Sequence, residues 1–395
     1  MKSNYKRLGD YIQLVDKRNQ DLRDLPLMGL SISKEFIPSI ANTIGTDMST
    51  YRIIKRNHFA YGPVTSRNGE KITIALFDDY DETLISQAYI PFEVSDTNRL
   101  MPEYLMMWFR RPEFDRYARF MSHGSAREIF AWEDMRNTQL PVPPIEKQRE
   151  IVAEYNAIKN RINLNNQLIQ KLEETAQAIY KQWFVEFEFP DENGKPYKSN
   201  GEEMVESELG EIPKGWRVGV LSDIANIIMG QSPEGESYNS NGEGMVFYQG
   251  RTDFGYRYPD ITTYTTQPTR KAKKGDILMS VRAPVGDLNI AVEDCCIGRG
   301  VAALRSLLKC NSYLFYLLQN LKPKFDISDG EGTIFGSINK DDLYNMEVVS
   351  SENITIEFDR IVSPIDKKIK AYCTENKELE ELKSLLLSKL ATIEN

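Results

Sequence analysis

Residues 143–183 read PPIEKQREIVAEYNAIKNRINLNNQLIQKLEETAQAIYKQW and carry the clearest structural signal in the chain. Its two prolines, Pro143 and Pro144, fix φ and separate the preceding segment from a new element. After Ile145, apolar or near-apolar side chains recur at alternating spacings of four and three residues, with Asn165 in the one remaining position. These side chains are Ile151, Tyr155, Ile158, Ile162, Ile169, Leu172, Ala176, Ile179 and Trp183. The heptad pattern predicts a coiled-coil helix over residues 144–187.

A second heptad segment ends the chain, over residues 351–395. Its apolar or near-apolar heptad positions are Phe358, Val362, Ile365, Ile369, Tyr372, Leu379, Leu386, Leu390 and Ile393. The polar Asn376 occupies one further position of the same stripe. An exposed apolar stripe must be buried, and the simplest solution is that the two helices bury each other. Because a whole domain separates them in the chain, we expect an antiparallel pair that holds two domains apart. The alternative is that each helix pairs with a different protein.

The segments before the two helices also repeat, with landmarks in the same order. Leu8-Gly9-Asp10 matches Leu221-Ser222-Asp223, and the aromatic run from Glu103 to Phe109 matches the run from Ser312 to Leu318. We therefore predict an α+β chain with a pseudo-twofold internal repeat. Two similar globular domains, residues 1–143 and 208–350, are joined by the antiparallel coiled coil, with a linker at residues 188–207. Residues 102–121 predict one helix, whose aromatic stripe packs in the core.

Composition is that of a globular protein, with 41% hydrophobic and 27% charged residues in 395. The first twenty residues are polar, no apolar run approaches the roughly 18 residues of a membrane helix, and the four cysteines form no CxxC pair. We therefore expect a cytoplasmic protein with reduced thiols. The net charge of −9 predicts weak binding to DNA by this chain alone, with partners supplying phosphate contacts.

Motifs for catalysis are missing from the sequence. It has two histidines, His58 and His123, and neither a phosphate-binding GxxxxGK[ST] loop nor a methyltransferase motif of the Asn/Asp-Pro-Pro-aromatic type. The isolated fragments Gly242-Glu243-Gly244 and Gly298-Arg299-Gly300 predict ordinary turns. We therefore expect no catalytic residue, metal site or cofactor site on this chain.

Several motifs resemble the DNA specificity subunit of type I restriction–modification systems, over essentially the whole chain. They are Leu209 to Trp216 (LGEIPKGW), Gly230 to Pro233 (GQSP), Gly275 to Gly286 (GDILMSVRAPVG), Ile297 to Ala303 (IGRGVAA) and Pro143 to Val152 (PPIEKQREIV). Two departures concern the element boundaries. The first domain lacks the GEIPxGW lead-in, and the second helix begins without the paired prolines.

The resemblance implies that each target-recognition domain reads one half of a bipartite site in double-stranded DNA. It further implies that the helices set the gap between the half-sites and dock two methyltransferase subunits, with restriction or motor subunits as possible further partners. S-adenosylmethionine and ATP with Mg²⁺ are then expected on the partner subunits and none on this chain. The alternative is a two-headed coiled-coil adaptor that binds proteins and has no DNA specificity.

Base edges and phosphates are bound mostly by Arg, Lys, Asn and Gln side chains, which directs attention to polar turns. The candidate DNA contacts are Arg67, Asn68 and Lys71 in the first domain, and Gln249, Arg251, Tyr256, Arg257, Arg270, Lys271, Lys273, Lys274 and Arg282 in the second. The densest basic run, from Arg270 to Lys274, suits a phosphate track. For each residue the alternative is an ordinary solvated side chain.

Overall fold

The computed structural model describes residues 5–66, 69–124, 127–326 and 337–393. Contacts divide the chain into two units, residues 1–165 with 374–395, and residues 166–373. Two long helices, α4 (Ile145–Phe184) and α8 (Glu352–Lys389), pass through both units. Each unit therefore contains one globular domain and one half of each long helix.

The first unit contains two four-stranded sheets with three short helices. One sheet is antiparallel throughout, in the order β2 (Ile12–Leu14), β9 (Ile90–Val94), β6 (Phe59–Tyr61), β7 (Ile74–Leu76). The other has the order β4 (Phe36–Pro38), β3 (Leu27–Leu30), β8 (Glu82–Ile85), β5 (Arg52–Lys55), and β3 is parallel to β8. The strand β1 (Tyr5–Arg7) pairs with β10 (Gln139–Pro141), and the turns η1 (Leu8–Asp10) and η2 (Met48–Thr50) complete the unit with α3 (Trp132–Asn137).

The helix predicted over residues 102–121 is two helices, α1 (Pro102–Phe109) and α2 (Pro112–Met121). Pro112 disfavours helical geometry at the preceding residue, and Arg111 is extended with ψ of 137°. The predicted burial of the aromatic stripe is confirmed for Tyr104, Trp108 and Phe109, which lie in the core of the unit. There the Phe109 ring meets Phe59 edge-on.

The second unit repeats this architecture. Its antiparallel sheet has the order β14 (Ala225–Met229), β22 (Val301–Ser306), β19 (Ile277–Ser280), β20 (Leu288–Ile290). Its second sheet has the order β15 (Tyr238–Asn239), β17 (Tyr264–Thr265), β16 (Met245–Tyr248), β21 (Cys295–Ile297), β18 (Lys271–Ala272), and β16 is parallel to β21. The remaining elements include α5 (Leu221–Ile224), α6 (Asn311–Asp326), α7 (Lys340–Tyr344), β13 (Arg217–Val220) and β23 (Glu347–Ser350).

The internal repeat is confirmed at the level of sheet topology. The order β2-β9-β6-β7 corresponds to β14-β22-β19-β20, with every neighbouring pair antiparallel in both. In the second sheets the parallel pair of β3 and β8 corresponds to that of β16 and β21. It follows that the loop between β3 and β4 corresponds to the loop between β16 and β17.

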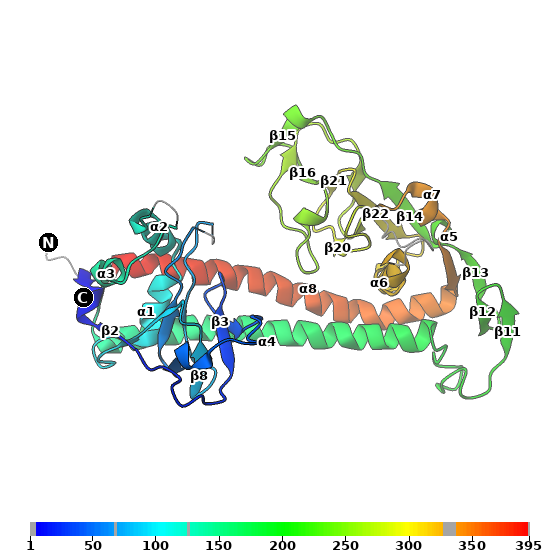
Figure 1. Cartoon of the computed structure of the whole chain (residues 1–395). Coiled ribbons are helices and arrows are strands. Elements are labelled where there is room, and N and C mark those ends of the chain that lie inside the picture. The colour runs from blue at the N-terminus through cyan, green and yellow to red at the C-terminus, as the bar shows by residue number, and fades with distance from the viewer. Residues whose placement is uncertain (1–4, 67–68, 125–126, 327–336, 394–395) are drawn as a thin grey trace. The chain divides into compact units, whose positions relative to one another are not determined.

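The predicted antiparallel helix pair is also confirmed, within each unit (Figure 1). In the first unit the early half of α4 meets the late half of α8, where Arg161 forms an ion pair of 2.7 Å with Glu375. The Asn165 side chain donates a hydrogen bond of 2.9 Å to Asn376, so the two asparagines predicted in the apolar stripes pair with each other. In the second unit the late half of α4 meets the start of α8, where Phe184 packs on Phe358.

The segment 188–207, predicted as a linker, packs against the second unit. Phe189 is buried and stacks on Trp216 with ring centroids 5.2 Å apart. At the end of the segment, β11 (Met204–Ser207) pairs with β12 (Gly210–Pro213). Packing in the second unit therefore includes residues before 208. The domain limits 1–143 and 208–350 stay a prediction.

Replacing Phe358 by Ala should lower the free energy of unfolding of the second unit by about 3–5 kcal/mol, because a large cavity replaces a buried ring. Phe358 is fully buried and contacts the rings of Tyr180, Trp183 and Phe184. Chemical denaturation followed by tryptophan fluorescence measures the change. Ile356→Ala, at a position that is 49% exposed on the same helix, is the control and should change stability little. Equal effects of the two substitutions would contradict this packing.

Candidate nucleic-acid interface

In the second unit, the ends of several strands meet at one edge. Met229 at the end of β14 lies opposite Ala302 near the start of β22, and Ser280 at the end of β19 lies opposite Val301. The turns that follow β14 and β19 and the turn that precedes β22 are therefore neighbours. They carry Gln231, Arg282 and Arg299.

The second sheet brings two further turns to the same edge. The Gly298 amide donates a hydrogen bond of 2.8 Å to the Tyr248 carbonyl, which places the turn after β16 beside the turn after β21. The Ile297 amide donates to the Arg270 carbonyl at 2.9 Å, and the Gln231 amide donates to the Ile297 carbonyl at 3.0 Å. Gln249 and Arg270 therefore lie near Gln231.

We call this set the recognition edge. It consists of five exposed residues, Gln231, Gln249, Arg270, Arg282 and Arg299. Three guanidinium groups attract phosphates and can donate in pairs to guanine, and two amides can both donate to and accept from adenine. The residue types therefore suit contact with DNA.

Glycines allow these turns to pack backbone against backbone. A Cβ atom on Gly230 would lie 2.1 Å from the Gly298 carbonyl oxygen, and one on Gly300 would lie 2.7 Å from the Gln249 carbonyl oxygen. Both distances are too short for a side chain at these positions. The Gly298-Arg299-Gly300 fragment is a turn, as predicted, and its close packing fixes where Arg299 is presented.

The predicted DNA contacts fall into several groups. Gln249, Arg270 and Arg282 belong to the recognition edge. Lys71, Lys271 and Lys274 are exposed side chains, and Lys273 is exposed but forms an ion pair of 2.7 Å with Asp294. Arg67 and Asn68 lie outside the described residues.

Arg251 is 44% exposed and forms an ion pair with Asp287, which also binds Lys322 at 2.5 Å. Burial by itself raises the pKa of Asp287, but hydrogen bonds from Lys322 and Arg251 outweigh it and hold that pKa below its ordinary value. Asp287 therefore stays ionised and neutralises part of the positive charge here. A DNA contact by Arg251 would have to compete with this ion pair.

The structure corrects the prediction for Arg257. Its side chain is 1% exposed and forms ion pairs with Glu173 at 2.8 Å and Asp366 at 2.5 Å. A buried and doubly paired guanidinium is not free to contact DNA. The neighbouring Tyr256 is 68% exposed, and its hydroxyl donates to Glu173 at 2.5 Å.

Sequence reasoning missed Gln231 and Arg299. Both lie in motifs that were quoted only for their resemblance to the family, Gln231 next to Gly230 and Arg299 between Gly298 and Gly300. The signal that could have found them is a long polar side chain next to glycines, which occurs in both motifs. The sequence does not show that hydrogen bonds bring the two turns together.

The equivalent turns of the first domain carry different side chains. The second residue after β8 is the exposed Gln87, where the second residue after β21 is Arg299. In the strand ladders Met28 pairs with Ile85 and Tyr248 pairs with Ile297, so the residue that corresponds to Gln249 is Gly29, which has no side chain. Two domains of one topology thus present different hydrogen-bonding groups at the same edge.

Comparison with known proteins places the chain in a family. Residues 15–174 and 213–355 match the model of the type I restriction modification DNA specificity domain, so the chain belongs to this family. It is 31% identical to a putative type I restriction enzyme MjaX specificity subunit of Methanocaldococcus jannaschii, over 81% of this chain and 74% of that protein. It is 22% identical to the type I restriction enzyme HindI specificity subunit of Haemophilus influenzae, over 86% of each chain.

The fold is also similar to a solved structure, that of the S subunit of a type I restriction–modification system from M. genitalium. The TM-score is 0.60 at 14% sequence identity, over 99% of this chain and 96% of the other. Among the residues that the structure describes, no helix is long and apolar enough to cross a membrane. The same residues contain no group of three or more His, Cys, Asp or Glu side chains placed to hold a metal ion.

Replacing Arg299 by Ala should weaken DNA binding by about 1–3 kcal/mol, because a base or phosphate contact would be lost. Gln249→Ala should weaken it by a similar amount, with little change in salt dependence, because an amide carries no charge. Fluorescence anisotropy with duplex DNA, on the chain assembled with its methyltransferase partner, measures both. The control is Arg217→Ala, which removes an exposed arginine from β13. Affinities for both variants that match the control would exclude the recognition edge as a DNA contact.

Proposed function

We propose that this chain is the sequence-specific DNA-recognition subunit of a type I restriction–modification complex. Each target-recognition domain reads one half of a bipartite site, and the α4–α8 pair sets the gap and docks methyltransferase subunits. One observation carries the proposal beyond family membership. The two domains repeat one sheet topology but present different side chains at the equivalent edge, as two readers of unlike half-sites require.

The proposed partners are double-stranded DNA and two methyltransferase subunits, with restriction or motor subunits as further members of the complex. S-adenosylmethionine and ATP with Mg²⁺ would bind to those subunits, and this chain would be non-catalytic and cytoplasmic. The net charge of −9 supports shared DNA binding, because long-range repulsion by this chain must be offset by cationic partners.

Methylome sequencing tests this function directly. The chain is expressed with the methyltransferase subunit in a host that lacks other DNA methylation. The expected result is methylation at one motif of two unlike half-sites, separated by a fixed gap of unspecified bases. Expression of the methyltransferase subunit alone is the control. A protein-binding adaptor without DNA specificity would leave both methylomes the same, and that result would overturn the proposal.

Lengthening both helices should lengthen the gap. A heptad inserted after Leu168 in α4, with a second after Tyr372 in α8, preserves the apolar stripe because the pattern repeats every seven residues. At 1.5 Å per residue each insertion adds roughly 10 Å, which is about three base pairs at 3.4 Å each. Methylome sequencing should show unchanged half-sites with the longer gap.

The control for this insertion is a seven-residue Gly/Ser segment after Asn241, in an exposed loop of the second domain. It adds the same number of residues away from the helices and should leave the gap unchanged. An unaltered gap after the paired helical insertion would overturn the proposal that the length of the helices sets the gap between half-sites.

A further inference from the structure

The loop between β16 and β17 contains both a residue of the recognition edge and a buried arginine. It begins at Gln249 of the recognition edge and continues to the buried Arg257. The carbonyl of Arg257 accepts a hydrogen bond of 3.0 Å from the Ile290 amide in β20. The loop is therefore held to the sheet by its backbone and to other elements by the Arg257 side chain.

Those other elements are the two long helices and α6. Glu173, on α4, and Asp366, on α8, bind different Nη atoms of Arg257 at 2.8 Å and 2.5 Å. Tyr316 of α6 places its hydroxyl 3.3 Å from Nη2, and the guanidinium lies 4.2 Å from the centre of the Phe315 ring. Removing one partner of a buried ion pair is strongly destabilising because it leaves an uncompensated charge. The Arg257 guanidinium thus ties one loop to both helices at once.

The corresponding loop of the first domain, between β3 and β4, also carries a buried cation. Lys34 is buried, its Nζ forms an ion pair of 2.8 Å with Asp115 of α2, and it donates to the carbonyl of Phe109. Burial lowers the pKa of Lys34 from its ordinary value. Both loops are thus held by a buried cation, but Lys34 ties its loop to the short helices of its own domain.

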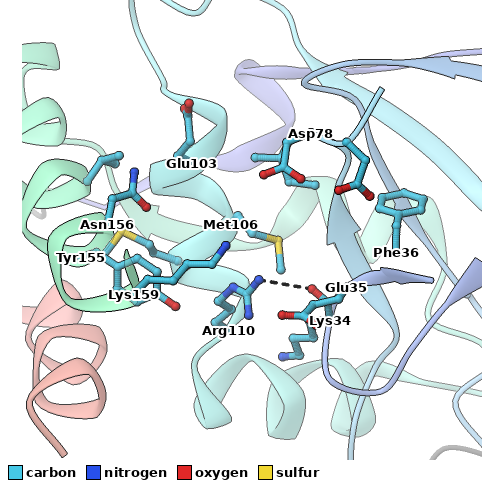
Figure 2. Close-up of a pocket in the computed structure, with 14 residues that line it drawn as sticks. Lys34, Glu35, Phe36, Asp78, Glu103, Met106, Arg110, Tyr155, Asn156 and Lys159 are labelled. Carbon is cyan, nitrogen blue, oxygen red and sulfur yellow. Dashed lines mark hydrogen bonds between the residues drawn. The ribbon is translucent and has the colours of Figure 1, made fainter. Parts of the chain in front are cut away.

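In the first unit, as in the second, residues of the loop and of α4 line a common cavity. A cavity of about 240 Å³ lies between Lys34 and Glu35 of the loop and Tyr155, Asn156 and Lys159 of α4. Figure 2 shows the loop residues on one side of this cavity and the α4 residues on the other. In the repeat, Lys159 takes the place of Asp366. The first domain therefore has a cation where the second has the carboxylate that binds Arg257.

We propose that Arg257 is a positioning residue for DNA recognition by the second domain. It fixes the loop that begins at Gln249 relative to both long helices, so that the second half-site is read at a defined distance along them. Its loss should relax the required gap between half-sites and weaken reading of the second half-site. The first half-site should be unaffected. This inference rests on the proposed function.

The test uses the whole chain in complex with its methyltransferase subunits. Arg257→Met, Glu173→Gln and Asp366→Asn are combined, so that the site becomes neutral and no carboxylate is left unpaired. The matched control combines Arg305→Met and Asp276→Asn, which neutralises a bidentate ion pair within the second domain, with contacts of 2.5 Å and 2.7 Å. Arg305 lies on β22, and Asp276 precedes β19. Folding is followed by thermal unfolding.

Methylation kinetics are measured on duplexes with the cognate gap and with a gap one base pair longer. The ratio compared is kcat/KM on the cognate duplex divided by kcat/KM on the duplex with the longer gap. For the triple variant this ratio should fall about tenfold, because KM rises on the cognate duplex while kcat is nearly unchanged. The control variant should keep the wild-type ratio. A single base change in the second half-site should also be tolerated better by the triple variant, while one in the first half-site should not.

A triple variant that folds and keeps the wild-type ratio would overturn the proposal, and so would a control variant that loses the ratio equally. Arg257→Lys is measured in parallel, because a lysine keeps the charge but lacks the fork that reaches both carboxylates. If the triple variant does not fold, the test rests on Arg257→Lys. A lowered ratio for this variant would support the proposal, and the wild-type ratio would overturn it. Failure of the proposed function is distinguishable, since the wild-type complex would then show no bipartite methylation at all.

Discussion

The burial of two apolar heptad stripes is the constraint on which the rest of the structure depends. Neither α4 nor α8 can leave its stripe in water, and the two helices cover each other in both units. Because they run antiparallel and each follows one globular domain, each domain is built onto the start of one helix and the end of the other. In the first domain this packing involves Tyr155 and Leu387, and in the second it involves Phe184 and Phe358.

On this shared scaffold the two domains keep one topology and differ at their surfaces. The antiparallel sheets have the same strand order, and the parallel pair occurs at the same place in the second sheets, one of which has the additional strand β15. A buried cation, Lys34 or Arg257, holds the same loop in each domain. The differences fall near the strand ends, where Gln87 corresponds to Arg299 and Gly29 corresponds to Gln249. Topology is therefore the conserved part of the repeat within this chain, and hydrogen-bonding chemistry at one edge is the variable part.

Much of the fold was predictable from the sequence because its signals are periodic or repeated. The heptads predicted two long helices, and the repeated landmarks predicted two similar domains. The split between α1 and α2 was missed, although Pro112 carried the signal. The burial of Arg257 could not be predicted, because its carboxylate partners are 84 and 109 residues away in the sequence. Gln231 and Arg299 were missed because the contact between their turns is made mainly by backbone atoms, which residue types do not reveal.

If each domain reads one half-site, two domains of one chain contact two separate segments of DNA. A hydroxyl-radical footprint of the assembled complex on a duplex with its methylated site tests this most directly. We expect two protected segments, centred about one helical turn of roughly 34 Å apart, with accessible backbone between them. The Arg299→Ala variant should weaken protection of one segment only. A single continuous footprint, or loss of both segments together in this variant, would show that the two domains do not bind separate segments.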